Sequence, residues 1–137
     1  MEDQKDQIKV IINGKEKEAE LNLSYSKERV CSLSISVDDD YQATFHDYDF
    51  FSCFAAMREE LKDVIFLCKG AKINVYPSAM ARDMGLGMLA YEVTLGEQAK
   101  TEDLVRIFDY EEHDVAVSPE EQRRFHLKWI DSIRQRP

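Results

Sequence analysis

The chain has 137 residues, a length typical of one domain, and 44% of them are hydrophobic, which suffices for a buried core. Its 18 basic and 27 acidic residues give a net charge of −9, which argues against binding nucleic acid or an anionic membrane surface. There is no apolar run of membrane-spanning length, and the initial MEDQKDQ lacks the features of a secretory signal, so we expect a cytoplasmic protein.

The first third of the chain predicts an antiparallel meander of about four strands. Residues 1–6 are polar, and we expect them to be disordered. Asn13-Gly14 is a strong signal for a tight hairpin turn, because a type I′ turn needs positive φ at both central positions. Apolar and polar residues alternate on both sides of this turn and in two later segments, so strands are predicted over 8–12, 17–23, 30–37 and 41–46.

Helical spacing replaces this alternation after residue 49. Phe50, Phe54, Met57 and Leu61 recur at the spacing of one helix face, with Asp47 or Asp49 placed to cap the N-terminus. We expect this helix to lie across the apolar face of the meander. Further strands are predicted over 64–68, 72–76 and 88–95, with the first two paired through a turn at Gly70.

The C-terminal part predicts two more helices. Thr101 precedes a short helix over 102–108, and the polar residues 109–114 form a loop. Ser118-Pro119-Glu120-Glu121 has the pattern of a capping box, so a terminal helix is predicted from there to about Arg134. An antiparallel sheet packed with a central and a C-terminal helix makes residues 1–137 a single α+β domain.

The segment NVYPSAMARDMGLGMLAY at 74–91 allows two interpretations. As a packed connection, Ser78 caps a short helix, Gly85 ends it in the left-handed conformation, and Met80 and Met84 pack into the core. As a binding segment, it forms a pocket lined by Tyr76, Arg82, Asp83 and Tyr91. A phosphate loop is disfavoured, because the glycines follow the predicted helix instead of preceding one.

Residues 68–91 also carry a resemblance. They resemble a group of small bacterial proteins without an assigned activity, through a pattern made of Cys68, Gly70, Ala71, Tyr76, Pro77, Ser78, Met80, Asp83, Met84, Gly85, Gly87 and Tyr91. In overall type, the chain is similar to the immunity proteins of contact-dependent growth inhibition and related toxin systems. These are small, often acidic, cytoplasmic α+β domains that block a toxin, and the resemblance identifies no binding residue here.

The sequence does not single out a catalytic or metal site. Cys31, Cys53 and Cys68 lie in apolar contexts and form no CxxC pair, so we expect buried, reduced thiols. The acidic residues near His46 and His113 lack zinc spacing, and His126 is expected at the surface. We therefore expect no enzyme activity, no metal and no cofactor.

Two acid-rich stretches with interspersed tyrosines suit a basic protein partner, because carboxylates steer association and Tyr provides anchors. The candidate partner-binding residues are Asp38, Asp39, Asp40, Asp47, Tyr48, Asp49, Tyr110, Glu111, Glu112 and Asp114. The first interpretation is an immunity protein that binds a basic toxin, such as a nuclease. The alternative is a small-molecule-binding or enzymatic domain that uses residues 68–91.

Overall fold

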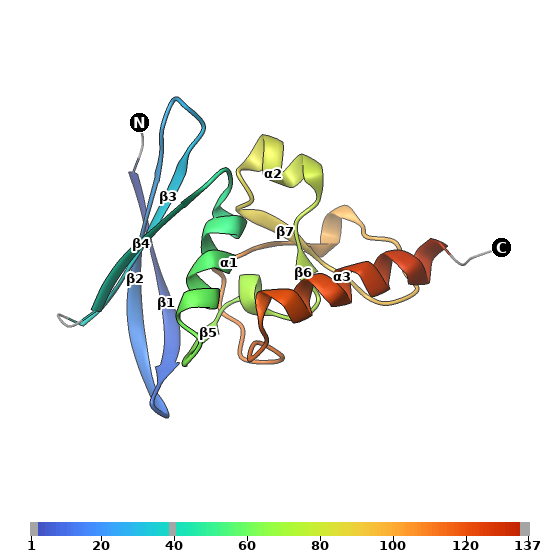
Figure 1. Ribbon diagram of the computed structural model, residues 1–137. Coiled ribbons are helices and arrows are strands. Elements are labelled where there is room, and N and C mark those ends of the chain that lie inside the picture. Colours follow the sequence, from blue (N-terminus) through green and yellow to red (C-terminus); the bar gives the residue numbers. More distant parts are fainter. Residues whose placement is uncertain (1–2, 39–40, 135–137) are drawn as a thin grey trace.

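Five antiparallel strands form a twisted sheet in the computed structural model, which describes residues 3–38 and 41–134 (Figure 1). The strand order is β4-β3-β2-β1-β5. In chain order, the strands are β1 (Asp3–Ile12), β2 (Lys15–Tyr25), β3 (Cys31–Val37), β4 (Tyr41–Asp47) and β5 (Val64–Leu67). The predicted α+β class and N-terminal meander are confirmed.

The first strand begins earlier than its apolar pattern indicates. Residues 3–6 belong to β1, so the prediction of disorder is wrong for them, and residues 1–2 lie outside the described part. A distant ion pair accounts for part of this order, because both carboxylate oxygens of Asp6 accept hydrogen bonds from Arg106, at 3.0 and 2.6 Å. The turn at Asn13 and Gly14 has positive φ at both residues, as the hairpin signal predicts.

One face of this sheet forms the core. The apolar side chains of β3 are buried, while Ser32 and Ser34 on the other face bond His46 and Thr44 of β4. Helix α1 (Phe50–Glu60) packs against this part of the sheet and buries Phe50, Phe51, Cys53, Phe54 and Met57. This arrangement confirms the amphipathic helix predicted from the spacing.

A second sheet of three short strands has the order β6-β7-β8. Its strands are β6 (Val75–Tyr76), β7 (Leu89–Glu92) and β8 (Leu104–Arg106). The predicted pairing of 64–68 with 72–76 is wrong, because β5 pairs with β1 and β6 pairs with β7. The chain turns between them in the 3-10 helix η1 (Lys69–Ala71), where Gly70 is so close to Ile107 that a Cβ would lie 3.0 Å from it.

The predicted helix over 102–108 is also wrong. The segment starts with a single 3-10 turn, η2 (Thr101–Asp103), and continues as β8, which pairs with β7. A helix of seven residues gains little from its own hydrogen bonds, so pairing with an available strand decides the conformation.

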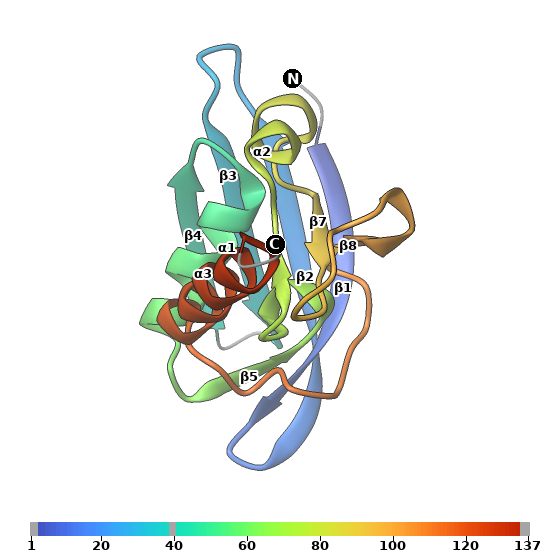
Figure 2. The ribbon, with the colours of Figure 1, turned by 90° about the vertical axis from the view of Figure 1, so that its right-hand side faces the viewer.

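Helix α3 (Pro119–Arg134) packs on β6 and α1, and it faces the viewer in Figure 2. Its capping box is confirmed, since Glu121 N–H donates to Ser118 Oγ at 3.1 Å and Ser118 N–H donates to Glu121 Oε1 at 3.3 Å. Gln122, in the first turn of α3, is 1% exposed. Its Nε2 lies 2.8–2.9 Å from the carbonyl oxygens of Gly70, Lys72 and Val75, which fixes α3 to the second sheet.

Candidate functional site around Asp49 and Arg82

Helix α2 (Ala79–Gly85) forms one wall of the site, and its two ends are held differently. Ser78 caps the N-terminus as predicted, accepting a hydrogen bond from Ala81 N–H at 3.0 Å. The C-terminal residue in the left-handed conformation is Leu86, with φ of 55°, so the prediction of Gly85 is wrong. Leu86 tolerates this conformation because its carbonyl oxygen accepts a 2.7 Å hydrogen bond from Phe50 N–H at the start of α1.

The two methionines of α2 do not enter the core. Met80 is 73% exposed and Met84 is 83% exposed, so the prediction that they pack inward is wrong. Arg82, halfway between them in sequence, lies on the opposite side of the helix and points toward α1. The inward face of α2 is therefore occupied by an ion pair, and the apolar side chains lie at the surface.

Asp49 and Arg82 form the centre of the site. Arg82 Nη1 lies 3.1 Å from Asp49 Oδ2 and 2.8 Å from Ser52 Oγ. Asp49 also caps α1 as predicted, because its Oδ1 accepts a hydrogen bond from Ser52 N–H at 2.8 Å. The guanidinium carbon lies 5.4 Å from the ring centre of Phe51 and 5.3 Å from that of Tyr76, distances that permit cation–π attraction.

A row of stacked rings extends from this centre along α3. The rings of Tyr76 and His126 are 4.2 Å apart and nearly parallel, and His126 also stacks on Trp129 at 5.7 Å. The expectation that His126 is a surface residue is wrong, because its ring is half-buried and Nδ1 has no hydrogen-bond partner among the described residues. Burial and the positive charge of Arg82 lower the pKa of His126.

A groove of about 590 Å³ lies between α1, Arg82 and the beginning of α3. Of the four residues predicted to line a pocket, Tyr76 and Arg82 do so. Asp83 instead accepts a 2.8 Å hydrogen bond from Arg29 through its carbonyl oxygen, and Tyr91 pairs with Tyr76 across the second sheet. The remaining lining residues are Asp47, Phe51, Ser52, Ala55, Glu59, Pro119, Glu120, Gln122 and Arg123.

The segments that meet at the Asp49–Arg82 pair carry several exposed side chains. We call this the α2 surface, and it comprises Val30, Asp47, Tyr48, Met80, Asp83 and Met84, all of them exposed. Three backbone segments meet here. Arg29 bonds Asp83, Cys31 Sγ lies 3.6 Å from the carbonyl oxygen of Tyr48, and Phe50 bonds Leu86. The 47–49 stretch and the 76–83 stretch, two separate candidates in the sequence, thus lie in one region.

The first acid-rich stretch is nevertheless not one surface. Asp38 and Asp47 lie at opposite ends of the pairing between β3 and β4, where Val37 faces Tyr41 and Cys31 faces Asp47. Asp38 is paired with Lys17 at 3.0 Å, and Asp39 and Asp40 lie outside the described residues. Asp49 is buried as a cap and ion-pair partner, which leaves Asp47 and Tyr48 exposed in this region.

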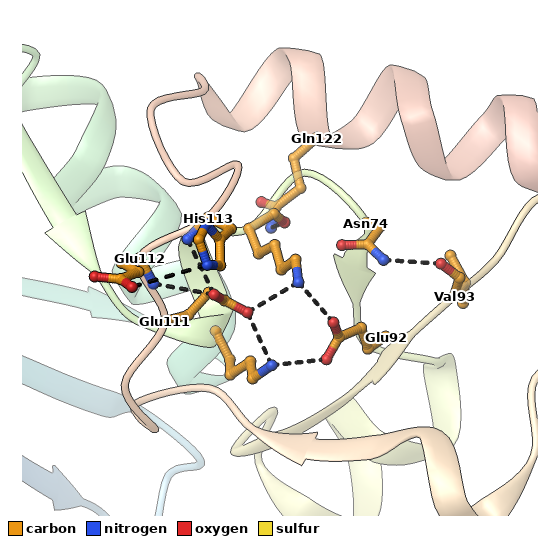
Figure 3. A network of polar contacts seen from close by, with 9 residues as sticks. Asn74, Glu92, Val93, Glu111, Glu112, His113 and Gln122 are labelled. Carbon is orange, nitrogen blue, oxygen red and sulfur yellow. Dashed lines mark hydrogen bonds and ion pairs between the residues drawn. The ribbon is translucent and has the colours of Figure 1, made fainter.

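The second acid-rich stretch includes a structural carboxylate. Glu111 is buried, and its Oε1 lies 2.9 Å from the amino groups of both Lys69 and Lys72, which also bond Glu92 (Figure 3). The hydrogen bond from Lys72, with backbone N–H groups and Lys69, holds the pKa of Glu111 far below its usual range. Glu111 is therefore not available to a partner.

The other members of this stretch are exposed but distant from the α2 surface. Tyr110, Glu112 and Asp114 lie at the surface, and Tyr110 OH donates to Glu112 at 2.9 Å. Tyr110 bridges Cys68, directly after the edge strand β5, and the connection that follows runs toward the end of the molecule opposite α2 (Figures 1 and 2). The sequence-predicted partner residues therefore form two separate surfaces.

The three cysteines are buried thiols, as predicted. Burial raises the pKa of Cys31 to about 11 and that of Cys53 and Cys68 to about 12, so these thiols stay protonated at neutral pH. Within residues 3–38 and 41–134, no three His, Cys, Asp or Glu side chains gather as a metal site would require. In the same ranges, no helix is both long and apolar enough to cross a bilayer.

Ser52 and His126 were not recognised from the sequence as neighbours of Arg82. The one available signal was Ser52 itself, three residues after Asp49, which matches a capping interaction.

No protein-family model and no curated protein matches this chain.

Proposed function

We propose that this protein is a non-enzymatic binding protein of the immunity type, which neutralises a basic protein toxin by docking it on the α2 surface. The observation that carries the proposal is the exposure of Tyr48, Met80 and Met84, which are 73%, 73% and 83% exposed on the two segments that the Asp49–Arg82 ion pair joins. Tyr and Met are enriched at protein interfaces and depleted from ordinary surface, because they offer large contact areas.

The α2 surface is supported from beneath by fixed contacts. The Asp49–Arg82 pair, the Asp49 cap and the Phe50–Leu86 hydrogen bond connect α2 to the start of α1. Side chains presented on a pre-organised backbone lose less entropy when a partner binds. Tyr48 and Met84 are therefore suited to serve as anchors.

Charge supports a basic partner. The chain carries a net charge of −9, and Asp47 and Asp83 are exposed within the α2 surface. Negative charge near and around an interface accelerates encounter with a positively charged partner, and salt weakens this effect. A nuclease-type toxin, whose own substrate is polyanionic, has the complementary charge.

Co-expression in a heterologous bacterium tests the proposal. The reading frame directly upstream of this gene should arrest growth, and this protein should restore growth by forming a complex that can be isolated. An upstream product that is harmless, or whose toxicity this protein does not relieve, contradicts the immunity function.

The surface is tested with two matched tyrosines. Tyr48→Ala should speed dissociation of the toxin, because an anchor is lost, whereas Tyr110→Ala on the other acidic surface should not. The Asp47→Asn, Asp83→Asn double variant should slow association at low salt, and the difference should disappear near 0.5 M salt, where the Debye length is a few Å. If Tyr110→Ala alone loses binding, the toxin binds at the 109–114 loop and not on the α2 surface.

The pocket interpretation has its own outcome in this experiment. Toxin binding that is indifferent to all these surface variants but abolished when Arg82 is replaced, in a variant that is still folded at the assay temperature, would favour the groove beside Tyr76 as the functional site.

A further inference from the structure

Arg58, near the C-terminus of α1, is a buried cation that forms no ion pair with a carboxylate among the described residues. It is 6% exposed, and none of the ion pairs in the described ranges involves it. Its Nη2 donates a 2.6 Å hydrogen bond to Gln122 Oε1, a neutral acceptor, and its guanidinium lies 5.1 Å from the ring centre of Phe54.

Two further donors of Arg58 have no partner. Nε and Nη1 are buried and make no hydrogen bond within the described part of the chain. Burial lowers the pKa of Arg58 to about 10, so the side chain still carries its charge at neutral pH. An uncompensated buried charge is costly, and the bond to Gln122 and the contact with Phe54 leave most of the guanidinium's donors unused.

Arg58 is among the residues that line a second groove, of about 440 Å³, between β5 and the segment leading into α3. This volume lies within the usual range for small-molecule sites. Much of the groove wall is aliphatic or aromatic, contributed by Val64, Ile65, Phe66, Val115, Ala116 and Val117. The groove therefore combines an apolar wall with a guanidinium that forms no ion pair with any described carboxylate.

The other charges of the groove limit what it can bind. Lys62 adds one positive charge, and Glu59 and Glu120 add two negative charges. Together with Arg58 they sum to zero, so the groove has no net positive charge that would hold a phosphate dianion, and recognition of a monoanion depends on the guanidinium itself. The apolar walls favour a ligand with a hydrocarbon body.

We propose that this groove binds a small amphiphilic monocarboxylate, with the carboxylate directed toward Arg58 and the hydrocarbon part against β5 and residues 115–117. The carboxylate supplies the ion-pair partner within hydrogen-bonding distance that no described carboxylate provides. This site is separate from the α2 surface, and its existence does not depend on toxin binding.

Hexanoate, 1-hexanol and inorganic phosphate are the probes that test the site in the full chain. Titration by NMR should show saturable shifts at the backbone amides of Ala116 and Val117 and at the Arg58 Nε–H with hexanoate. Hexanol and phosphate should each bind at least about tenfold more weakly, which corresponds to about 1.4 kcal/mol. If hexanol binds as tightly as hexanoate, the charge of Arg58 does not contribute and the proposal is wrong. If phosphate binds as tightly as hexanoate, the apolar wall does not contribute and the proposal is also wrong.

Variants give an independent test. Arg58→Met should weaken hexanoate binding at least about tenfold, Arg58→Lys should retain most of it, and Lys128→Met, on the exposed face of α3, should leave it within about twofold. Absence of any saturable hexanoate shift in the wild-type protein would refute the proposal, even if Arg58→Met fails to fold.

Discussion

Gly87 has no side chain and so leaves room for the Asp49 carboxylate, which caps the N-terminus of α1. A Cβ on Gly87 would lie 2.8 Å from Asp49 Oδ1 and 3.0 Å from Phe51 N, and the residue has a positive φ of 73°. The glycine after α2 is therefore required both by its backbone conformation and by the close approach of the α1 N-terminus. This contact joins the segment 74–91 to the start of α1.

Gly87→Ala should lower the free energy of unfolding by about 2 kcal/mol or more, because positive φ and a steric clash act together. Gly85→Ala is the matched control, since a Cβ at Gly85 would meet no other part of the fold within 4 Å and its φ is not positive. That substitution should be neutral or stabilise by up to about 1 kcal/mol, because Gly85 is within α2. Urea denaturation of both variants measures the difference, and equal effects would contradict the steric argument.

Replacing Arg82 should cost the protein more stability than replacing Met84, although Arg82 is charged and Met84 is apolar. Arg82→Met removes the partner of the buried Asp49 and the contacts with Phe51 and Tyr76, so we expect a loss of about 1–3 kcal/mol. Met84→Ala removes an 83% exposed side chain and should change stability by less than about 0.5 kcal/mol. Thermal or urea unfolding checks this, and a large loss in Met84→Ala would mean that Met84 is buried.

Acidification should destabilise the protein through His126. Its pKa is lowered in the folded state, so the unfolded chain binds the proton more readily. The contribution of His126 is therefore complete well above the unfolded pKa of about 6.5 and decreases as the pH falls below it. Urea denaturation at pH 7.5 and 5.5 should show a smaller decrease in His126→Gln than in the wild type. His113→Gln, at an exposed position, is the control and should retain the wild-type decrease.

A network of four charged residues should make the stability depend on pH at lower pH values than His126 does. Its members are Lys69, Lys72, Glu92 and Glu111. Glu111→Gln should cost about 3 kcal/mol at pH 7, because it leaves two largely buried ammonium groups with one carboxylate. The folded-state pKa of Glu111 is depressed, so its contribution is present above the unfolded value of about 4.5 and is lost as the pH falls further.

The difference between the wild type and Glu111→Gln should therefore be constant from pH 8 to about 5 and shrink below pH 4.5. Glu112→Gln, one residue further and exposed, should change stability by less than about 0.5 kcal/mol. A difference that persists unchanged to pH 3 would contradict the ion-pair origin of the effect.

The features that the sequence predicted correctly depend on neighbouring residues. The Asn13-Gly14 turn, the Asp49 cap and the capping box at Ser118 each involve residues no more than three positions apart. The alternation in β3 and the spacing in α1 are similarly local, and they assign a buried face to each element. The chemistry of each short stretch was therefore sufficient to predict these elements.

The orientation of α2 and the structure of 102–108 were decided by tertiary contacts. Arg82 turns inward because Asp49, 33 residues earlier, lies beside α2, and this pair places Met80 and Met84 at the surface. Residues 104–106 form a strand because β7 offers an unpaired edge, and a segment this short has too little helix stability to resist. Glu111 is buried because Lys69 and Lys72, about forty positions away, neutralise it.

By itself, then, the sequence determined the type and the buried face of most elements, since apolar periodicity and capping act within a few residues. Which charged side chains are paired, and which tyrosines and methionines remain exposed, was decided by the packing of segments far apart in the chain. Asp49 and Glu111 are buried because folding brings a cation within hydrogen-bonding distance of each, and those distances exist only in the folded structure.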